Sequence, residues 1–112
     1  LDAKGRDKQA WAITRADGAP MMLAGLWTDN RTLGTETYTV ITTAPNKEMA
    51  SIHNRMPAML DLAGIGPWLE ADWDAARQLA VPAPDAILKM WKIGPEVGNV
   101  RNNYPELLTP VE

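Results

Sequence analysis

Residues 38–60, YTVITTAPNKEMASIHNRMPAML, carry the strongest structural signals in this 112-residue chain, including its only histidine. The opening run is rich in Thr, Val and Ile, which is typical of a buried strand. Asn46 can cap a helix, because its side-chain oxygen can accept a free backbone N–H of the first turn. We therefore expect a short helix over residues 47–52, and Pro57 ends any helix at or before Met56.

The predicted strand end and helix end bring Thr42, His53 and Arg55 within reach of one another. A structural interpretation needs only a threonine bonded to the backbone, an imidazole bonded to a carbonyl and an arginine paired with a surface carboxylate. A functional interpretation makes His53 an acid or base, since histidine exchanges a proton near neutral pH. Arg55 would then hold an anion such as a phosphate, which the planar guanidinium suits. The residues alone leave both interpretations open.

The residues before and within this stretch predict an antiparallel meander of three strands. Residues 9–15 alternate in polarity, and the Asp-Gly pair within residues 16–20 is typical of a turn. Residues 21–27 are almost continuously apolar and predict a central strand. Residues 28–36 are polar and predict a surface loop, and residues 37–43 predict the third strand.

The residues that follow predict short helices and one long strand. Residues 59–60 end a short strand, and residues 61–79 are helical in character, with one start at Pro67, a favourable first helical residue. Asp72 or Asp74 can cap a second helix. Residues 81–84 predict a stiff linker, residues 87–93 a strand, and residues 95–99 and 106–108 single helical turns.

The amino-acid composition restricts which metal, disulfide and membrane-spanning features the chain can contain. The chain has no cysteine, which excludes disulfides and thiolate zinc sites, and its single histidine argues against a transition-metal site. We expect no metal and no cofactor. No apolar run approaches the about 20 residues that span a bilayer, so we expect no membrane partner.

The charge and the tryptophans allow more than one interpretation. A net charge of −3 argues against nucleic-acid binding, but local charge makes a groove positive, and Lys4, Arg6, Lys8 and Arg15 cluster near the start. We predict that most of the five tryptophans pack in the core and see no reason to assign a base-stacking role to any of them. The tryptophans assigned to the core are Trp11, Trp27, Trp68 and Trp73.

Three stretches resemble the SOS response-associated peptidase (SRAP) family. Residues 42–60, TTAPNKEMASIHNRMPAML, resemble its signature, in which a strand ends in Thr, a short helix follows, and I-H-x-R-M-P leads into an apolar strand. Residues 11–27, WAITRADGAPMMLAGLW, resemble the hairpin before the signature, and residues 97–111, VGNVRNNYPELLTPV, resemble the closing motif. The stretches occur in the family's order and cover nearly the whole chain.

The resemblance implies an α+β fold: mainly antiparallel β-sheet, with a barrel-like β core and short flanking helices. Family members begin Met-Cys-Gly-Arg, and loss of the Met leaves an N-terminal cysteine as nucleophile. A catalytic glutamate lies in a G-x-[FY]-E-W segment just before the hairpin. This chain contains neither feature, so we expect residues 1–112 to be the C-terminal portion of a single SRAP-like domain.

The function that the resemblance implies is abasic-site sensing in single-stranded DNA during the DNA damage (SOS) response. The N-terminal cysteine forms a thiazolidine crosslink with the abasic sugar, after autoproteolytic release of the initiator Met. His53 takes the catalytic histidine's role. The implied DNA contacts are Arg55, Thr42, Asn99 and Arg101, and a turn-forming structural role is the alternative for Asn99 and Arg101. The implied location is cytoplasmic and nucleoid-associated.

Two other classes of function stay open at this point. One is a non-catalytic module that binds DNA or a protein, and the other is a hydrolase for an unrelated small substrate, which only His53 supports. Without a thiol, these 112 residues alone should be inactive. The sequence leaves the oligomeric state open, but an unpaired sheet edge would invite association with another chain.

Overall fold

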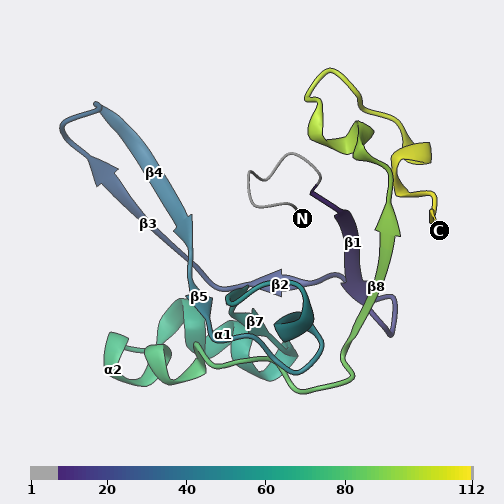
Figure 1. The fold of residues 1–112 in the computed structure, drawn as a ribbon. Coiled ribbons are helices and arrows are strands. Elements are labelled where there is room, and N and C mark those ends of the chain that lie inside the picture. Colours follow the sequence, from purple (N-terminus) through teal and green to yellow (C-terminus); the bar gives the residue numbers. More distant parts are fainter. Residues whose placement is uncertain (1–7, 112) are drawn as a thin grey trace. The chain divides into compact units, whose positions relative to one another are not determined.

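The computed structural model describes residues 8–111, which divide into two compact units (Figure 1). Unit 1 contains the residues up to Gly18 and those from Leu88 onward, and unit 2 contains Ala19–Ile87. Two of the basic residues near the start, Lys4 and Arg6, lie outside the described residues.

Unit 1 is built on one antiparallel ladder. Strand β1 (Ala10–Arg15) pairs with β8 (Leu88–Ile93), and Ala12 lies opposite Trp91. The expected meander is therefore wrong, because β1 pairs with a strand more than 70 positions away instead of the next one. Pairing depends on how side chains pack across the ladder, which a local pattern does not reveal. The expected turn after β1 is present, and Gly18 supplies its left-handed backbone with φ of +79°.

The tail of unit 1 closes on β8 through two helical turns near the predicted positions, η3 (Pro95–Gly98) and η4 (Pro105–Leu108). Trp91 Nε1 donates to the carbonyl of Leu108 at 2.7 Å. The backbone N–H of Val111 donates to the carbonyl of Lys92 at 2.9 Å. These bonds attach the end of the chain to β8.

Unit 2 contains three short antiparallel ladders. The longest is a hairpin, in which β3 (Gly25–Asn30) pairs with β4 (Thr35–Val40). Strand β5 (Thr42–Thr43) pairs with β6 (Met56–Pro57). Strand β2 (Met22–Leu23) pairs with β7 (Met59–Leu60).

The hairpin overturns the predicted loop over residues 28–36. The strands continue to Asn30 and resume at Thr35, around a tight turn in which Gly34 has φ of +68°. Asn30 Oδ1 accepts the backbone N–H of Leu33 at 3.0 Å. The strands of this hairpin are exposed along much of both faces, so their outer halves carry polar residues without the alternation that identifies a half-buried strand.

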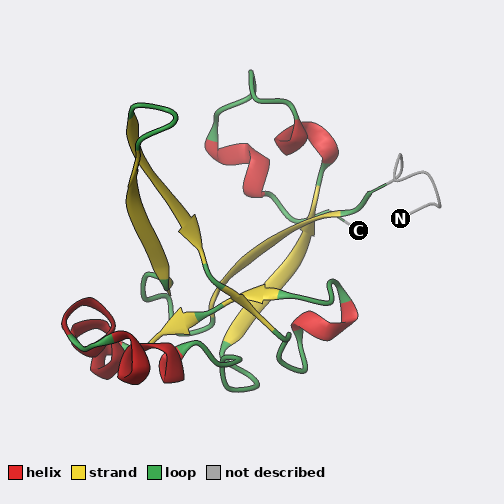
Figure 2. Cartoon of the chain, turned by 90° about the vertical axis from the view of Figure 1, so that its left-hand side faces the viewer, coloured by secondary structure: helices red, strands yellow, loops and turns green. Residues whose placement is uncertain are grey.

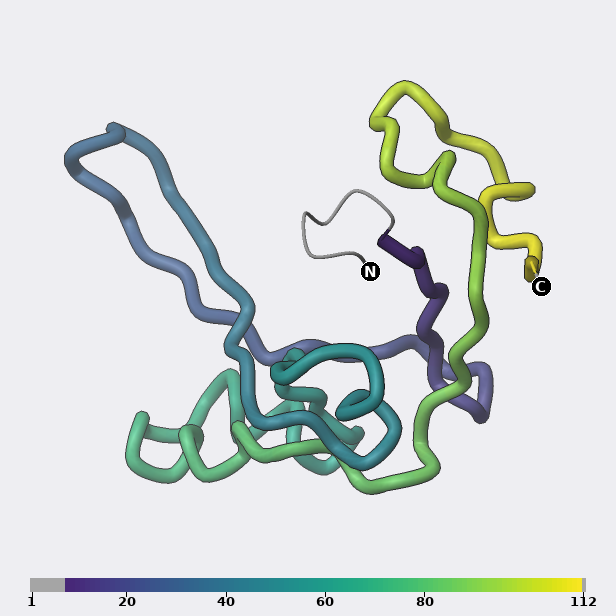
Figure 3. Tube along the Cα trace, viewed as in Figure 1, coloured from purple at the N-terminus to yellow at the C-terminus, as the bar shows by residue number. Residues whose placement is uncertain are grey.

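The three ladders of unit 2 meet at Ala24, Ile41 and Ala58, each of which separates two strands. Their backbones form a closed ring of hydrogen bonds: Ala24 donates to Ala58, Ala58 to Ile41, and Ile41 to Ala24, each at 2.9 Å. Each segment therefore leaves one partner strand and joins another at this residue. Figure 3 shows the hairpin segments running side by side before they separate.

The core of unit 2 forms around this junction. Ala24 and Ala58 are completely buried and Leu60 is nearly so. Partly buried side chains pack against these three residues, one from the position before β5 and the others from the helical region: Ile41, Ile65, Trp68, Leu79 and Ala80. Across the described residues, the strands form two-stranded sheets and no closed barrel, so the expected barrel-like core is not seen in residues 8–111, whereas the antiparallel α+β class is confirmed.

The helices of unit 2 are α1 (Leu62–Glu70), α2 (Trp73–Ala76) and η2 (Arg77–Leu79). Figures 1 and 2 show α1 and α2 at the opposite end of the unit from the hairpin tip. No helix in the described part of the chain is long and apolar enough to cross a membrane.

The predicted helix start at Pro67 is wrong, because α1 begins five residues earlier and contains Pro67. The physical reason is the cap at Asp61, whose Oδ1 accepts the backbone N–H of Gly64 at 2.8 Å. The second predicted cap is confirmed: Asp72 accepts the backbone N–H of Ala75 at 3.0 Å.

The tryptophans are less buried than predicted. Trp68 is half-buried against the core and donates from Nε1 to the carbonyl of Gly25 at 3.0 Å. Trp73 meets it edge-on, with ring centroids 6.1 Å apart, but remains 52% exposed. Trp27 is 69% exposed, so its assignment to the core is wrong in this structure.

Candidate functional site

A tight turn ahead of His53 positions the candidate site, and Asn46 organises that turn. Asn46 is buried, and its Oδ1 accepts the backbone N–H of Met49 at 3.0 Å, as predicted for a cap. The helix that follows, η1 (Met49–Ser51), is shorter than expected and of the 3₁₀ type. His53 lies two residues after the end of η1, and its backbone N–H donates to the carbonyl of Met49 at 2.8 Å.

A second segment fixes the same turn from 38 residues away. Asn46 Nδ2 donates to the carbonyl of Pro84 at 3.3 Å, and Asp85 Oδ1 accepts the backbone N–H of Lys47 at 2.7 Å. Glu48 in return accepts the backbone N–H of Ala86. The predicted linker over residues 81–84 therefore leads into a docked segment. Sequence reasoning missed Glu48 and Asp85, because no local pattern pairs them.

His53 is exposed, and the backbone of Arg55 orients its ring. The imidazole Nδ1 accepts the backbone N–H of Arg55 at 3.0 Å and lies 3.2 Å from the carbonyl oxygen of Arg55. One nitrogen cannot accept and donate at once, so the two contacts belong to different tautomers. With Nδ1 unprotonated, Nε2 carries the proton and can donate it. With Nδ1 protonated and bonded to the carbonyl, Nε2 can accept one.

Arg55 is bound to Thr42 through its guanidinium. One terminal nitrogen donates to the Thr42 carbonyl at 2.9 Å and to Thr42 Oγ1 at 3.0 Å, and Nε lies 3.3 Å from Oγ1. The pairing of β5 with β6 places the two residues together. The structural interpretation of Arg55, a pair with a surface carboxylate, is not what the structure shows, because no carboxylate within residues 8–111 pairs with Arg55. The second terminal nitrogen keeps its two N–H groups for a ligand.

The structure thus brings Thr42, Arg55 and His53 together on one exposed edge of unit 2. Thr42 Oγ1 accepts from Arg55, so its own hydroxyl proton can be donated outward. The edge therefore offers a hydroxyl, a guanidinium and an imidazole nitrogen. No group of three or more potential metal ligands is arranged around an ion site in the described part of the chain.

A comparison with models of known protein families shows which family this chain belongs to. A family model described as SOS response associated peptidase (SRAP) matches residues 2–100. The chain belongs to the SRAP family. The resemblance seen in the sequence is therefore confirmed over most of the chain.

Curated relatives of this SRAP chain carry related names. The abasic site processing protein YedK of Escherichia coli is 26% identical over 96% of this chain and 51% of its own length. The abasic site processing protein HMCES of Gallus gallus is 35% identical over 68% of this chain and 23% of its own length. The SRAP chain thus spans about half the length of the Escherichia coli relative.

Two solved structures share the fold. A Bacteroides thetaiotaomicron protein superposes with a TM-score of 0.79 at 21% identity, over 96% of this SRAP chain and 50% of its own. A Bordetella bronchiseptica protein superposes with a TM-score of 0.67 at 28% identity, over 83% of this chain and 49% of its own.

The other two predicted DNA contacts of the SRAP chain, Asn99 and Arg101, belong to unit 1. Asn99 Oδ1 accepts the backbone N–H of Arg101 at 3.0 Å, so this side chain stabilises a turn. The Arg101 side chain is exposed. The turn is the structural alternative that the sequence left open, and a DNA contact by either residue stays a prediction.

Proposed function

We propose that these residues form part of a SRAP protein that senses abasic sites in single-stranded DNA and crosslinks to them. The observation that carries the proposal is the arrangement of Thr42, His53 and Arg55 in a chain that belongs to the family. The names of the curated relatives, abasic site processing proteins, support the same substrate. A role in the SOS response and a cytoplasmic, nucleoid-associated location are parts of this proposal.

The chemistry needs a nucleophile from outside these cysteine-free residues. In the proposed reaction, the amine of an N-terminal cysteine, exposed when the initiator Met is released, adds to the aldehyde carbon of the ring-opened sugar. Water leaves to give an imine, and the thiol then adds to the same carbon, which closes a thiazolidine. The loss of water requires a proton donor at the departing hydroxyl.

His53 suits this proton transfer because the residue is exposed and its contacts within the described residues use Nδ1, which leaves Nε2 available in both tautomers. The backbone N–H of Arg55, 3.0 Å from Nδ1, favours the form in which Nε2 carries the proton and can donate it. The nearby carbonyl supports the reverse form. A shift between these two hydrogen bonds would let one imidazole give a proton in one step and take one in another.

Arg55 and Thr42 suit the flanking phosphate. The guanidinium is already positioned by its bonds to Thr42, so little side-chain entropy is lost when its remaining N–H groups bind an oxyanion. The hydroxyl proton of Thr42 provides one further donor beside it.

The test uses a protein that contains these residues together with an N-terminal cysteine. We expect a crosslink to an oligonucleotide with one abasic site that survives denaturing electrophoresis, and none to the intact oligonucleotide. His53→Ala should slow crosslinking by about 100-fold or more. Asn54→Ala, at an exposed neighbouring position, is the matched control and should keep the wild-type rate.

Two results would contradict the proposal. Wild-type kinetics in the His53→Ala protein would remove this residue from the mechanism. Binding of abasic DNA without any covalent product, from a protein with an intact N-terminal cysteine, would indicate a non-catalytic binding module instead.

A further inference from the structure

The loop that carries the candidate site is closed at its base. This loop, residues 46–56, is here called the histidine loop. The backbone N–H of Asn46 donates to the sulfur of Met56 at 3.2 Å, and both residues are buried. The carbonyl of Met49 accepts the backbone N–H of His53 at 2.8 Å, and Met49 is itself bonded to Asn46. The backbone of His53 is therefore linked to the base of the loop.

Two carboxylates join the histidine loop to residues 84–86 in opposite directions. Asp85 Oδ1 accepts the backbone N–H of Lys47 at 2.7 Å, and Glu48 accepts the backbone N–H of Ala86. These two reciprocal hydrogen bonds are here called the clasp. A hydrogen bond to an ionised carboxylate is stronger than one between neutral groups. Because each segment supplies one carboxylate and one backbone donor, the clasp restricts how the two segments can shift past each other.

Residues 84–86 provide a rigid support for the clasp. Ala83, directly before them, is buried, and the ring of Pro84 restricts the backbone. Ala86, the residue whose N–H Glu48 accepts, has φ of +66°. Among the described residues it is the one non-glycine position with left-handed backbone. Such a strained conformation persists only where the surroundings enforce it, and strain of this kind gathers at functional sites.

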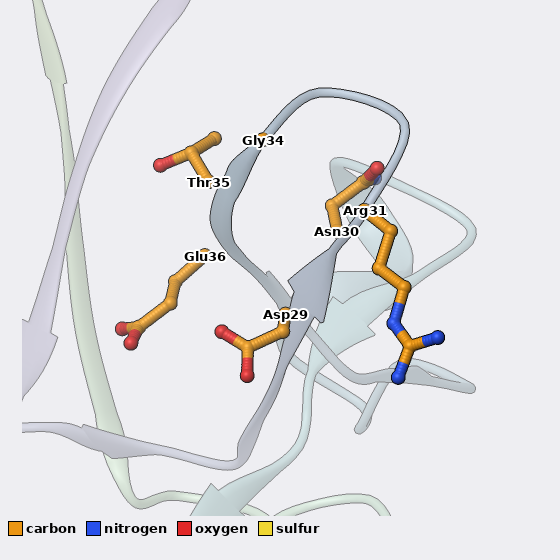
Figure 4. A pocket seen from close by; sticks show the side chains of 6 residues that line it. All are labelled: Asp29, Asn30, Arg31, Gly34, Thr35 and Glu36. Carbon is orange, nitrogen blue, oxygen red and sulfur yellow. The ribbon is translucent and has the colours of Figure 1, made fainter.

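The clasp differs from other carboxylates of unit 2. Figure 4 shows the carboxylates of Asp29 and Glu36 on one side of the β3–β4 hairpin, away from the guanidinium of Arg31. Neither carboxylate makes a hydrogen bond or ion pair within residues 8–111. Asp61 and Asp72 bond to backbone N–H groups three positions along the chain, in their own helices. The clasp instead joins positions 38 residues apart, so its carboxylates fix tertiary structure.

The clasp constrains His53 by a route that the guanidinium of Arg55 does not share. That guanidinium is held by the carbonyl and hydroxyl of Thr42, in β5. The ring of His53 is oriented by the backbone N–H and carbonyl of Arg55, and this contact depends on the path of the histidine loop. A relaxed loop would therefore release the imidazole while the guanidinium stays bound.

We propose that Glu48 and Asp85 are positioning residues for His53. The clasp holds the histidine loop in the backbone geometry in which Nδ1 accepts the N–H of Arg55, so that Nε2 carries the proton used in crosslinking. Both carboxylates act through the backbone of the loop and not on the substrate. This inference rests on the proposed role of His53 in the reaction.

The first measurement is independent of the crosslinking chemistry. It records the ¹⁵N NMR signals of the histidine rings, at a pH where the rings are neutral, in a protein that contains these residues together with an N-terminal cysteine. The His53 signals are those missing from His53→Ala, and they should show a proton mainly on Nε2. Glu48→Ala with Asp85→Ala should bring the Nδ1 and Nε2 shifts closer together, because the two tautomers then mix. Glu48→Gln with Asp85→Asn keeps an acceptor oxygen at each position and should retain the wild-type shifts.

The second measurement is the rate of crosslinking at saturating abasic DNA, at a temperature where circular dichroism shows every variant folded. Glu48→Ala with Asp85→Ala should lower this rate by about 10- to 100-fold, the usual loss for a misplaced catalytic group. The DNA concentration that gives half the maximal rate should stay within about twofold, because Arg55 remains bound to Thr42. Glu48→Gln with Asp85→Asn should restore the rate. Glu70→Ala with Asp74→Ala removes two exposed carboxylates of the same unit and should leave the rate unchanged.

Three results would overturn the proposal. The first is wild-type ring shifts in the double alanine variant, and a lower urea midpoint alongside them would make the clasp purely structural. The second is altered shifts with a wild-type crosslinking rate. The third is a Gln and Asn variant as slow as the double alanine variant, which would assign the effect to charge. A wild-type protein that forms no crosslink would instead contradict the proposed function, and the ring shifts would still decide whether the clasp orients His53.

Discussion

Arg55 combines two tasks at the residue scale, since it fixes Thr42 and offers its remaining N–H groups to a ligand. In a protein that contains these residues together with an N-terminal cysteine, Arg55→Ala should weaken binding to abasic single-stranded DNA. The slope of log K against log salt should become shallower by about 0.7 to 1, the contribution of one phosphate. Equilibrium binding at four salt concentrations measures it.

The controls for Arg55 separate charge from structure. Arg77→Ala removes an exposed arginine of the same unit, whose side chain is 61% exposed, and should leave the slope unchanged. An unchanged slope in Arg55→Ala, together with a lower urea midpoint, would make this arginine a purely structural link to Thr42.

Asn46 is the residue on which the turn ahead of His53 depends. Asn46→Ala removes the acceptor of the Met49 N–H and the donor to the Pro84 carbonyl at a buried position. We expect the free energy of unfolding to fall by about 1–3 kcal/mol. Urea denaturation measures it, and Asn54→Ala, which is exposed, should change stability by less than about 0.5 kcal/mol. Equal losses of stability in Asn46→Ala and Asn54→Ala would show that the buried hydrogen bonds of Asn46 do not stabilise the fold.

At the scale of elements, the ring of hydrogen bonds at Ala24, Ile41 and Ala58 joins the three ladders of unit 2. Ala58 is completely buried there, so a larger side chain has no space. Ala58→Leu should lower the free energy of unfolding by about 1–3 kcal/mol. Ala63→Leu, at an exposed position of α1, is the control and should be nearly neutral in the same urea titration. An unchanged free energy of unfolding in the Ala58→Leu protein would show that the junction accommodates a larger side chain without loss of stability.

At the scale of the whole molecule, the proposed reaction needs a thiol, and the chain holds none. We expect the 112-residue chain alone to give no crosslink with abasic single-stranded DNA that survives denaturing electrophoresis. A protein that contains these residues together with an N-terminal cysteine, run on the same gel, is the positive control. A heat-stable product from the cysteine-free chain would place the nucleophile within these residues and contradict the proposed reaction.

The sequence by itself determined the local features of this protein: the caps at Asn46 and Asp72, the turn at Gly18 and the strand that became β8. These features depend on residues within a few positions of one another, so pattern and composition suffice. The SRAP signature likewise lies in one continuous segment. The pattern of that segment was therefore enough to predict that Thr42, His53 and Arg55 lie together.

Only the tertiary structure decided which strands pair and which groups meet. The pairing of β1 with β8, the bonds from Pro84 and Asp85 to the turn, and the exposure of Trp27 all depend on segments far apart in the chain. Strand pairing is selected by packing between faces, and the same apolar residue suits a core or a docking surface. Sequence alone therefore assigned Trp27 to the interior, whereas in the structure its side chain is 69% exposed.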